Sequence, residues 1–270
     1  FFSRNTLINV FLEIAGEDHF RLSSHIRLLF LRTPISPLLA VVCIDPSLGK
    51  VDKSSFSQST LMELFADGIT NKQAFCAKTS SPQTLDDWLG LALDGSTNVV
   101  RINWSSRHVQ GSVDLQWLPP TVCYAELDHN ELKGTVDLTA LPETLESLRM
   151  RFNRLSGTLA LHCLPGTLES LFLDSNRLFG SLDLDHLPKS LGYLYLSDNQ
   201  FEGTISLTNL PQSLAHLDLA NNLLSGPING SCLPHGMLVL RLDRNNLVGS
   251  TIFENLPECM REIKLTDTQL

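Results

Sequence analysis

The chain has 270 residues, of which 43% are hydrophobic and only 7% aromatic, so its apolar side chains are mostly aliphatic. Its formal net charge at pH 7 is −9. Because an acidic surface without a dense basic patch repels phosphate, we expect no nucleic-acid partner.

The N-terminal segment, residues 1–55, contains no repeat. Its most apolar stretch, residues 26–44, includes two arginines and two prolines, so no transmembrane segment is predicted in this chain. The sequence that follows Arg32 is faintly similar to a secretory signal. We predict that residues 1–55 form a poorly structured leader or an upstream extension. Whether this segment is native or cleaved, and whether Met62 is the natural start, stays open.

Residues 56–98 are predicted to form a helical N-terminal cap. Ser59–Ala66 has the apolar spacing of a short amphipathic helix. A second helix is predicted over residues 82–93, because Pro82 suits the first position of a helix. The side chains expected to cover the open edge of the domain that follows are Trp88, Leu89 and Leu93.

From Val99 onward the sequence has a constant 23-residue period. Three sets of equivalent positions, here called columns, keep this step. The columns are Asn130, Asn153, Asn176, Asn199, Asn222 and Asn245; Gly111, Gly134, Gly157, Gly180, Gly203, Gly226 and Gly249; and Pro119, Pro142, Pro165, Pro188, Pro211, Pro234 and Pro257. We predict a domain over residues 99–270 with seven copies and a partial one. Whether the chain continues past Leu270 is open.

A clean copy is LESLRMRFNRLSGTLALHCLPGT, residues 145–167, and this unit resembles the leucine-rich repeat family. The Asn-x-Leu-x-Gly-Thr stretch is similar to the plant-type subclass, and the Leu-Pro before each next copy is similar to repeats of some protists. The resemblance implies an α/β repeat fold, a right-handed solenoid (horseshoe) with short parallel strands on its concave face. A copy of this length has no room for a long convex helix, so we expect extended segments and 3₁₀ turns there.

The resemblance extends to the cap, where a helix, Trp88 and the first strand follow in the plant-type order. That cap usually carries a cysteine pair around its tryptophan, which this chain lacks. The departure weakens any inference of an oxidising compartment. The compartment therefore stays unassigned: the cytoplasm is slightly favoured, and secretion or the cell surface is the alternative.

Each column has a physical role. The Leu-x-Leu stretch is expected to be a strand with alternate residues pointing inward. The column asparagine is expected to be buried and to bond backbone groups of its own and neighbouring copies. Glycine permits a tight turn, and the Ser or Thr and aliphatic residue after it suit a second extended segment. A single copy buries too little to fold alone, so stacking must supply the rest.

The residues between and after the strand leucines are expected to point out of the concave face. Aromatic and arginine side chains gather in the middle copies, a composition common in binding hot spots. The predicted partner-binding residues are Arg149, Arg151, Phe152, Phe172, Tyr195, Asp218, Arg241 and Arg244. An ordinary solvated sheet with scattered aromatics is the alternative.

No pattern in the sequence indicates catalysis. The six cysteines have neither metal-binding nor redox spacing, and no nucleotide-binding or nucleophile motif occurs. We expect no enzymatic activity, no cofactor and no metal. The predicted function is that of a monomeric scaffold that binds a protein or peptide on its concave face. The alternative is a ligand-binding ectodomain fragment of a receptor-like membrane protein, for which glycosylation of the triplets at Asn103 and Asn229 is an open question.

Overall fold

The computed structural model describes residues 29–30, 39–40, 53–76, 84–249, 252–253, 256–266 and 268. The chain divides into two compact units, Phe1–Ser55 and Phe56–Leu270. In the first unit, the described backbone is an antiparallel pair of short strands, β1 (Leu29–Phe30) and β2 (Leu39–Ala40), and a 3₁₀ turn, η1 (Lys53–Ser55). The predictions made for the leader fall almost wholly outside the described residues.

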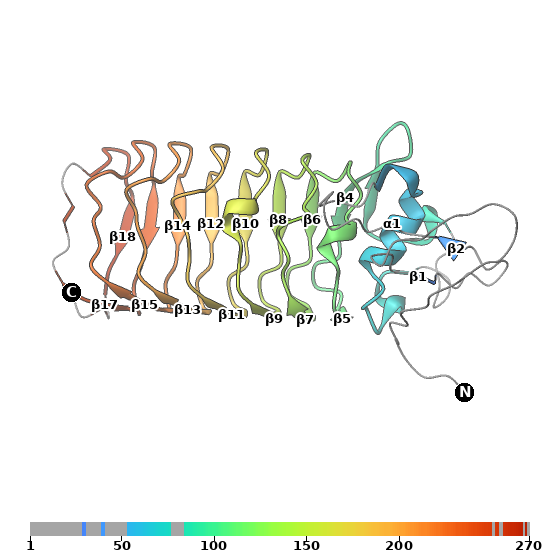
Figure 1. The fold of residues 1–270 in the computed structure, drawn as a ribbon, viewed down its shortest axis with the longest axis horizontal. Helices are drawn as coiled ribbons and strands as arrows, with labels where there is room; N and C mark the ends of the chain where they lie inside the picture. The colour runs from blue at the N-terminus through green and yellow to red at the C-terminus, as the bar shows by residue number, and fades with distance from the viewer. Residues whose placement is uncertain are drawn as a thin grey trace, which may run out of the picture. The chain divides into compact units, whose positions relative to one another are not determined.

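The second unit is a parallel β-solenoid in which each repeat forms one turn of chain, here called a coil, and gives one strand to each of two sheets (Figure 1). The nine-stranded sheet contains β3 (Leu91–Leu93), β4 (Val99–Asn103), β6 (Tyr124–Glu126), β8 (Ser147–Arg149), β10 (Ser170–Phe172), β12 (Tyr193–Tyr195), β14 (His216–Asp218), β16 (Val239–Arg241) and β18 (Glu262–Lys264). The seven-stranded sheet contains β5 (Gln110–Gly111), β7 (Glu131–Thr135), β9 (Arg154–Gly157), β11 (Arg177–Gly180), β13 (Gln200–Gly203), β15 (Leu223–Gly226) and β17 (Asn246–Leu247).

The strand register follows the sequence period. In the nine-stranded sheet Leu148 pairs with Leu171, and Leu171 pairs with Leu194, so each pair joins equivalent positions of successive copies. These leucines have no exposed surface, so the columns of aliphatic side chains form one continuous core. Between the sheets, the described coils contain only short 3₁₀ turns, η4 (Leu115–Trp117) and η5 (Leu161–Cys163). The predicted fold class, a leucine-rich repeat solenoid without long convex helices, is confirmed.

The column asparagines link neighbouring coils as predicted. The Asn153 amide nitrogen donates to the carbonyl of Leu127 in the preceding coil at 2.9 Å and to the carbonyl of Met150 in its own coil at 3.1 Å. Its carbonyl oxygen accepts from the backbone nitrogen of Leu132 at 3.0 Å. The same pattern recurs from Asn130 to Asn245. Buried backbone groups at the turn are therefore satisfied by one side chain per coil.

A second ladder of side-chain hydrogen bonds was not predicted from the sequence. The hydroxyl of Thr167 donates to the carbonyls of Glu143 and Leu145, 24 and 22 residues earlier in the chain, at 2.8 and 2.9 Å. Thr144 and Ser213 make equivalent bonds from the same place in their coils, shortly after the column proline. This column was visible in the sequence, because a hydroxyl residue recurs at that place in each copy up to Ser213.

The second extended segment lies earlier in the coil than predicted. We expected it to follow the column glycine, but β9 and β11 end at Gly157 and Gly180. The backbone of Gly180 has φ of +89°, and a Cβ there would lie 2.8 Å from the Thr158 methyl carbon of the preceding coil. The glycine thus ends the strand, since only a residue without a side chain fits this conformation and this contact.

The cap begins with the predicted helix, α1 (Gln58–Phe65), which starts where the Ser57 hydroxyl accepts from the Thr60 nitrogen. The prediction of a second helix over residues 82–93 was wrong. The described part of that range holds a 3₁₀ turn, η3 (Leu85–Asp87), and then β3, which pairs antiparallel with β4. The backbone of Gly90 has φ of +84°, which a right-handed helix does not contain. The backbone groups at the edge of β4 would be unpaired without β3, so pairing with β3 is favoured there.

The cap is held to the first coil by aromatic side chains. Phe75 stacks on Trp104 with ring centroids 4.2 Å apart and on Trp88 at 5.3 Å. The Trp104 indole nitrogen donates to the carbonyl of Leu89 at 3.0 Å. Trp88 is buried as expected for a covering residue, but the side chain of Leu89 is 43% exposed and does not cover the coil. A further short 3₁₀ turn, η2 (Lys72–Ala74), precedes Phe75.

Candidate functional site

The candidate site lies on the strand face, defined as the outward-facing side chains of β4 to β18 in the nine-stranded sheet. In a typical strand of this sheet the central residue is buried and its two neighbours are partly exposed, as in Ser147, Leu148 and Arg149. A groove of about 320 Å³ runs over this face. Its lining includes six of the eight predicted residues, namely Arg151, Phe152, Tyr195, Asp218, Arg241 and Arg244.

Aromatic rings and guanidinium groups stack along the middle coils. The Arg149 guanidinium lies 4.8 Å from the centre of the Phe172 ring, which in turn stacks on Tyr195 at 4.9 Å. Arg151 lies 5.4 Å from the ring centre of Phe152, whose side chain is 44% exposed. A cation over an aromatic ring is held by the ring quadrupole, so these side chains form an ordered surface before any ligand binds.

Carboxylates lie beneath two of the arginines. Arg149 donates through Nε to Asp128 Oδ2 at 3.0 Å, and Arg151 approaches Asp174 Oδ2 at 3.0 Å through a terminal nitrogen. The aspartates are 5% and 3% exposed. Burial raises the pKa of Asp174 above its ordinary value, although Arg151 acts in the opposite direction. For Asp174, desolvation therefore outweighs the attraction of its partner.

A charged network closes the C-terminal side of the groove. Arg241 bonds Glu262 through two nitrogens, at 2.9 and 3.1 Å, and reaches Asp218 at 3.4 Å. Hydrogen bonds from Arg241 and from Lys264 lower the pKa of Glu262 to about 2. Burial raises the pKa of Asp218, which is only 5% exposed. Asp218, one of the predicted partner-binding residues, lines the groove and also accepts from Arg241.

Comparison with known proteins identifies the fold. No family model matches the sequence, and the search of curated proteins returned no match. The solved structure of a pollen receptor kinase 3 is similar, with 25% identity and a TM-score of 0.55 over 73% of this chain and 99% of that one. The leucine-rich repeat ectodomain of the receptor kinase GASSHO1/SCHENGEN3 from Arabidopsis thaliana, solved in complex with Casparian strip integrity factor 2, has 22% identity and a TM-score of 0.56. The chain has the leucine-rich repeat fold.

The chain matches different shares of these two structures. It matches nearly the whole of the first, but 79% of the chain matches only 30% of the second. The likeness to the ectodomain of GASSHO1/SCHENGEN3 therefore concerns only part of that ectodomain.

The residues that the structure describes lack two further features. Among them, no helix has the length and apolar character needed to cross a membrane. Across the same residues, no three His, Cys, Asp or Glu side chains are grouped so that they could hold a metal ion.

Within this leucine-rich repeat fold, some of the predicted residues lie on the strands of the strand face and others lie just after them. Arg149, Phe172, Tyr195 and Arg241 lie on strands β8, β10, β12 and β16. Phe152 and Arg244 lie after the strands, at positions with φ of +52° and +55°. This left-handed conformation is uncommon outside glycine and turns the chain away from the sheet. The Phe152 ring stacks on His129, with centroids 4.4 Å apart.

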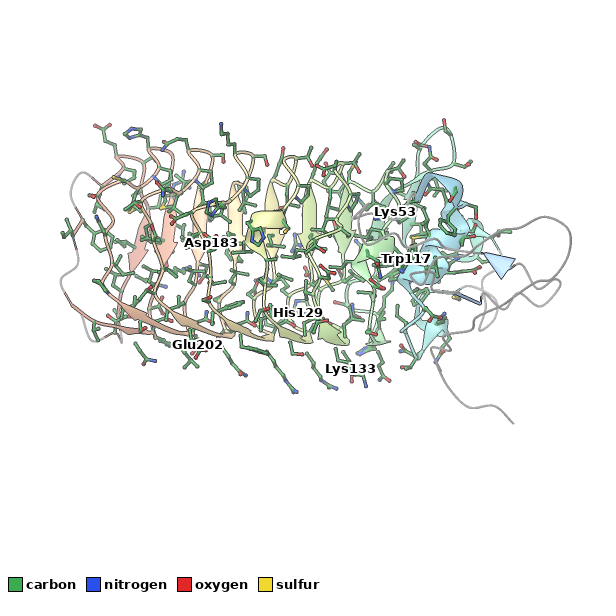
Figure 2. The ribbon with its side chains drawn as sticks, in the orientation of Figure 1. Lys53, Trp117, His129, Lys133, Asp183 and Glu202 are labelled. Carbon is green, nitrogen blue, oxygen red and sulfur yellow. The ribbon has the colours of Figure 1, made fainter. Side chains whose placement is uncertain are left out.

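The residues that precede the central leucine of each strand were not predicted to belong to the site. His216 in this column lies with Nδ1 2.8 Å from the phenol oxygen of Tyr195, and its ring packs against Tyr193 at 5.0 Å. Tyr193 is 42% exposed. The strand period of two could have found these residues, because positions before and after a buried leucine point to the same side. The side chains on the seven-stranded sheet, among them Lys133 and Glu202, lie along a separate surface (Figure 2).

Proposed function

We propose that this protein is a non-enzymatic scaffold that binds a protein or peptide partner on its strand face. The observation that carries the proposal is the ordered stack of Arg149, Phe172 and Tyr195 beside a groove of about 320 Å³. Pre-ordered aromatic and arginine side chains lose little conformational entropy on binding, and such residues dominate the energy of many interfaces.

Several features support a binding role over catalysis. The arginines of the groove are held by carboxylates, as Arg151 is by Asp174, and such pairing fixes their geometry. The groove is an open surface that spans several coils, which suits an extended ligand. The surface is also long compared with a small-molecule pocket, because it extends from Phe152 to Lys264.

The test is selection of displayed random peptides on the immobilised protein, followed by binding of the selected peptides to two variants. The strand-face variant carries Arg149→Ala, Phe172→Ala and Tyr195→Ala. The matched control carries Arg177→Ala and Phe179→Ala with Glu202→Ala, all exposed on the seven-stranded sheet. We expect the strand-face variant to lose binding and the control to retain it. Unchanged affinity in the strand-face variant contradicts the proposal.

A second candidate function is that of a ligand-binding ectodomain of a receptor-like membrane protein. The likeness to the pollen receptor kinase 3 structure, at 25% identity over 99% of that chain, favours it. Surface biotinylation of intact cells that produce the full-length protein tests this candidate. Labelling from outside the cell supports a receptor, and a protein protected from the reagent until the cells are lysed contradicts it.

A further inference from the structure

One column of the groove differs from the rest of the strand face. Its residues in four successive coils are Asp174, Ser197, Ala220 and Asp243, and all four line the groove. Two small side chains thus lie between two carboxylates. Because the carboxylates are three coils apart, their separation is about 14 Å at the usual spacing of paired strands.

Each of these two aspartates has an oxygen without a donor. Asp174 Oδ1 and Asp243 Oδ1 are buried and accept no hydrogen bond from the described part of the chain. Asp128, two coils before Asp174 in the same column, shows the contrast. Its Oδ1 accepts from the backbone nitrogen of Arg151 at 3.0 Å, and its Oδ2 accepts from Arg149. A buried acceptor without a donor is unfavourable, so these two oxygens favour a ligand that brings donors.

The arginine and lysine side chains that line the groove already have interaction partners within the chain. Arg151 is held by Asp174 Oδ2, Arg241 is bonded by Glu262, and Lys264 lies 2.9 Å from the same glutamate. Arg244 also has an interaction partner. An anionic ligand would have to break these pairs, whereas a cationic one leaves them intact. The whole chain carries −9 at pH 7, so its overall field does not repel a cation.

From this arrangement we infer that the groove binds an extended peptide with two basic side chains at positions i and i+4, one directed to Asp174 and the other to Asp243. The inference rests on the proposed function and names its class of ligand. In an extended chain, residues i and i+4 point to the same side and are separated by about 13 Å, which matches the two carboxylates. Residues i and i+3 point to opposite sides. A donor reaches Oδ1 of Asp243 after rotation of its carboxylate about the terminal bond, which is a soft torsion.

Fluorescence anisotropy with three labelled peptides tests this spacing. The first is Gly-Ser-Lys-Ala-Ser-Ala-Lys-Ser-Gly, with lysines at i and i+4. The second, Gly-Ser-Lys-Ala-Ser-Lys-Ala-Ser-Gly, has the same composition with lysines at i and i+3, and the third replaces both lysines of the first by glutamate. We expect the first peptide to bind roughly tenfold more tightly than either of the others, as a charge-assisted hydrogen bond would give. Equal or tighter binding of the glutamate peptide overturns the inference.

Variants of the protein locate the contact. Asp243→Asn and Asp174→Asn keep the side-chain shape but remove the charge, and each is expected to abolish the preference for the first peptide. Asp185→Asn, at an exposed position outside the groove, is the matched control and is expected to keep it. Melting followed by circular dichroism verifies that each variant folds. If Asp174→Asn does not fold, the result for Asp243→Asn decides. Asp174 forms an ion pair with Arg151, whereas Asp243 forms none among the described residues of the groove, so its replacement disturbs the fold less. A preference that survives in Asp243→Asn overturns the inference.

The two proposals fail in different ways. If the displayed peptides depend on Phe172 and Tyr195 but contain no spaced basic pair, the proposed function stands and the inference about the ligand is wrong. If no selected peptide depends on the strand face, the proposed function is wrong as well.

Discussion

The phenol oxygen of Tyr195 lies 2.8 Å from Nδ1 of His216 on the adjacent strand, so the two side chains join β12 to β14 across the strand face. Burial lowers the pKa of His216, and the positive charges of Arg241 and Arg261 act in the same direction. The imidazole is therefore mostly neutral at pH 7, and it shares one hydrogen bond with the Tyr195 hydroxyl, in which the imidazole tautomer decides which group donates.

This pair predicts how stability depends on pH. The unfolded chain protonates His216 near its ordinary pKa of about 6.5, and the folded chain does so only at lower pH. His216 therefore contributes fully to the free energy of unfolding at pH values above its pKa in the unfolded chain. This contribution is lost as the pH falls through its pKa in the folded chain. We expect the free energy of unfolding to decrease less from pH 7 to pH 5 in His216→Gln than in the original chain, as measured by urea denaturation.

The control for this titration is His235→Gln, at an exposed position in a loop. Its pH profile is expected to follow that of the original chain. Comparison within one pH series removes the effect of Asp174 and Asp218, whose raised pKa values give a pH dependence of the opposite sign. Parallel profiles for the original chain and His216→Gln contradict the prediction.

Replacement of a column asparagine is expected to destabilise the solenoid strongly. Asn222 is 6% exposed, donates to the carbonyls of Leu196 and Leu219 at 3.1 Å, and accepts from the Phe201 nitrogen at 3.0 Å. Asn222→Ala leaves these buried groups unsatisfied and should lower the free energy of unfolding by about 3 kcal/mol. Chemical denaturation measures the loss. Asn209→Ala, at an exposed loop position, should change it by less than about 0.5 kcal/mol.

The glycine column provides a second stability test. Gly180→Ala forces a side chain into a backbone with φ of +89° and against the methyl group of Thr158. The expected cost is about 1–2 kcal/mol from the backbone conformation alone. Gly166→Ala is the control, since a Cβ there meets no atom within 4 Å. Equal midpoints of urea unfolding for the two variants would show that the glycine conformation is not needed.

The Arg149–Phe172 contact can be measured by a double-mutant cycle. Arg149→Met and Phe172→Leu, alone and together, should give a coupling energy of about 0.5–1 kcal/mol at this partly exposed site. In the control cycle, Arg149→Met is combined with Tyr193→Leu, which lies two coils away on β12. The control effects should add to within about 0.5 kcal/mol. A coupling no larger than that of the control would mean that the 4.8 Å contact does not contribute to stability.

The sequence by itself determined the solenoid. Residues at equivalent positions of successive copies have equivalent surroundings, so the constant repeat step was sufficient to place Leu148, Leu171 and Leu194 in one buried column. The same argument predicted that Asn153 bonds the coil before it, because its column lies at a turn whose backbone groups have no other partners. It also placed Arg149, Phe172 and Tyr195 on one side of the sheet.

Only the tertiary structure decided which of those side chains bond one another and which are buried. The wrong prediction for residues 82–93 shows why: the local pattern favours a helix, but the open edge of β4 pairs with β3 instead. Asp174 and Asp218 are buried beneath Arg151 and Arg241, and these contacts were not predicted from the sequence pattern. Side chains on adjacent coils are a full repeat apart in sequence, so rotamers and packing, which no repeat pattern encodes, determine their contacts.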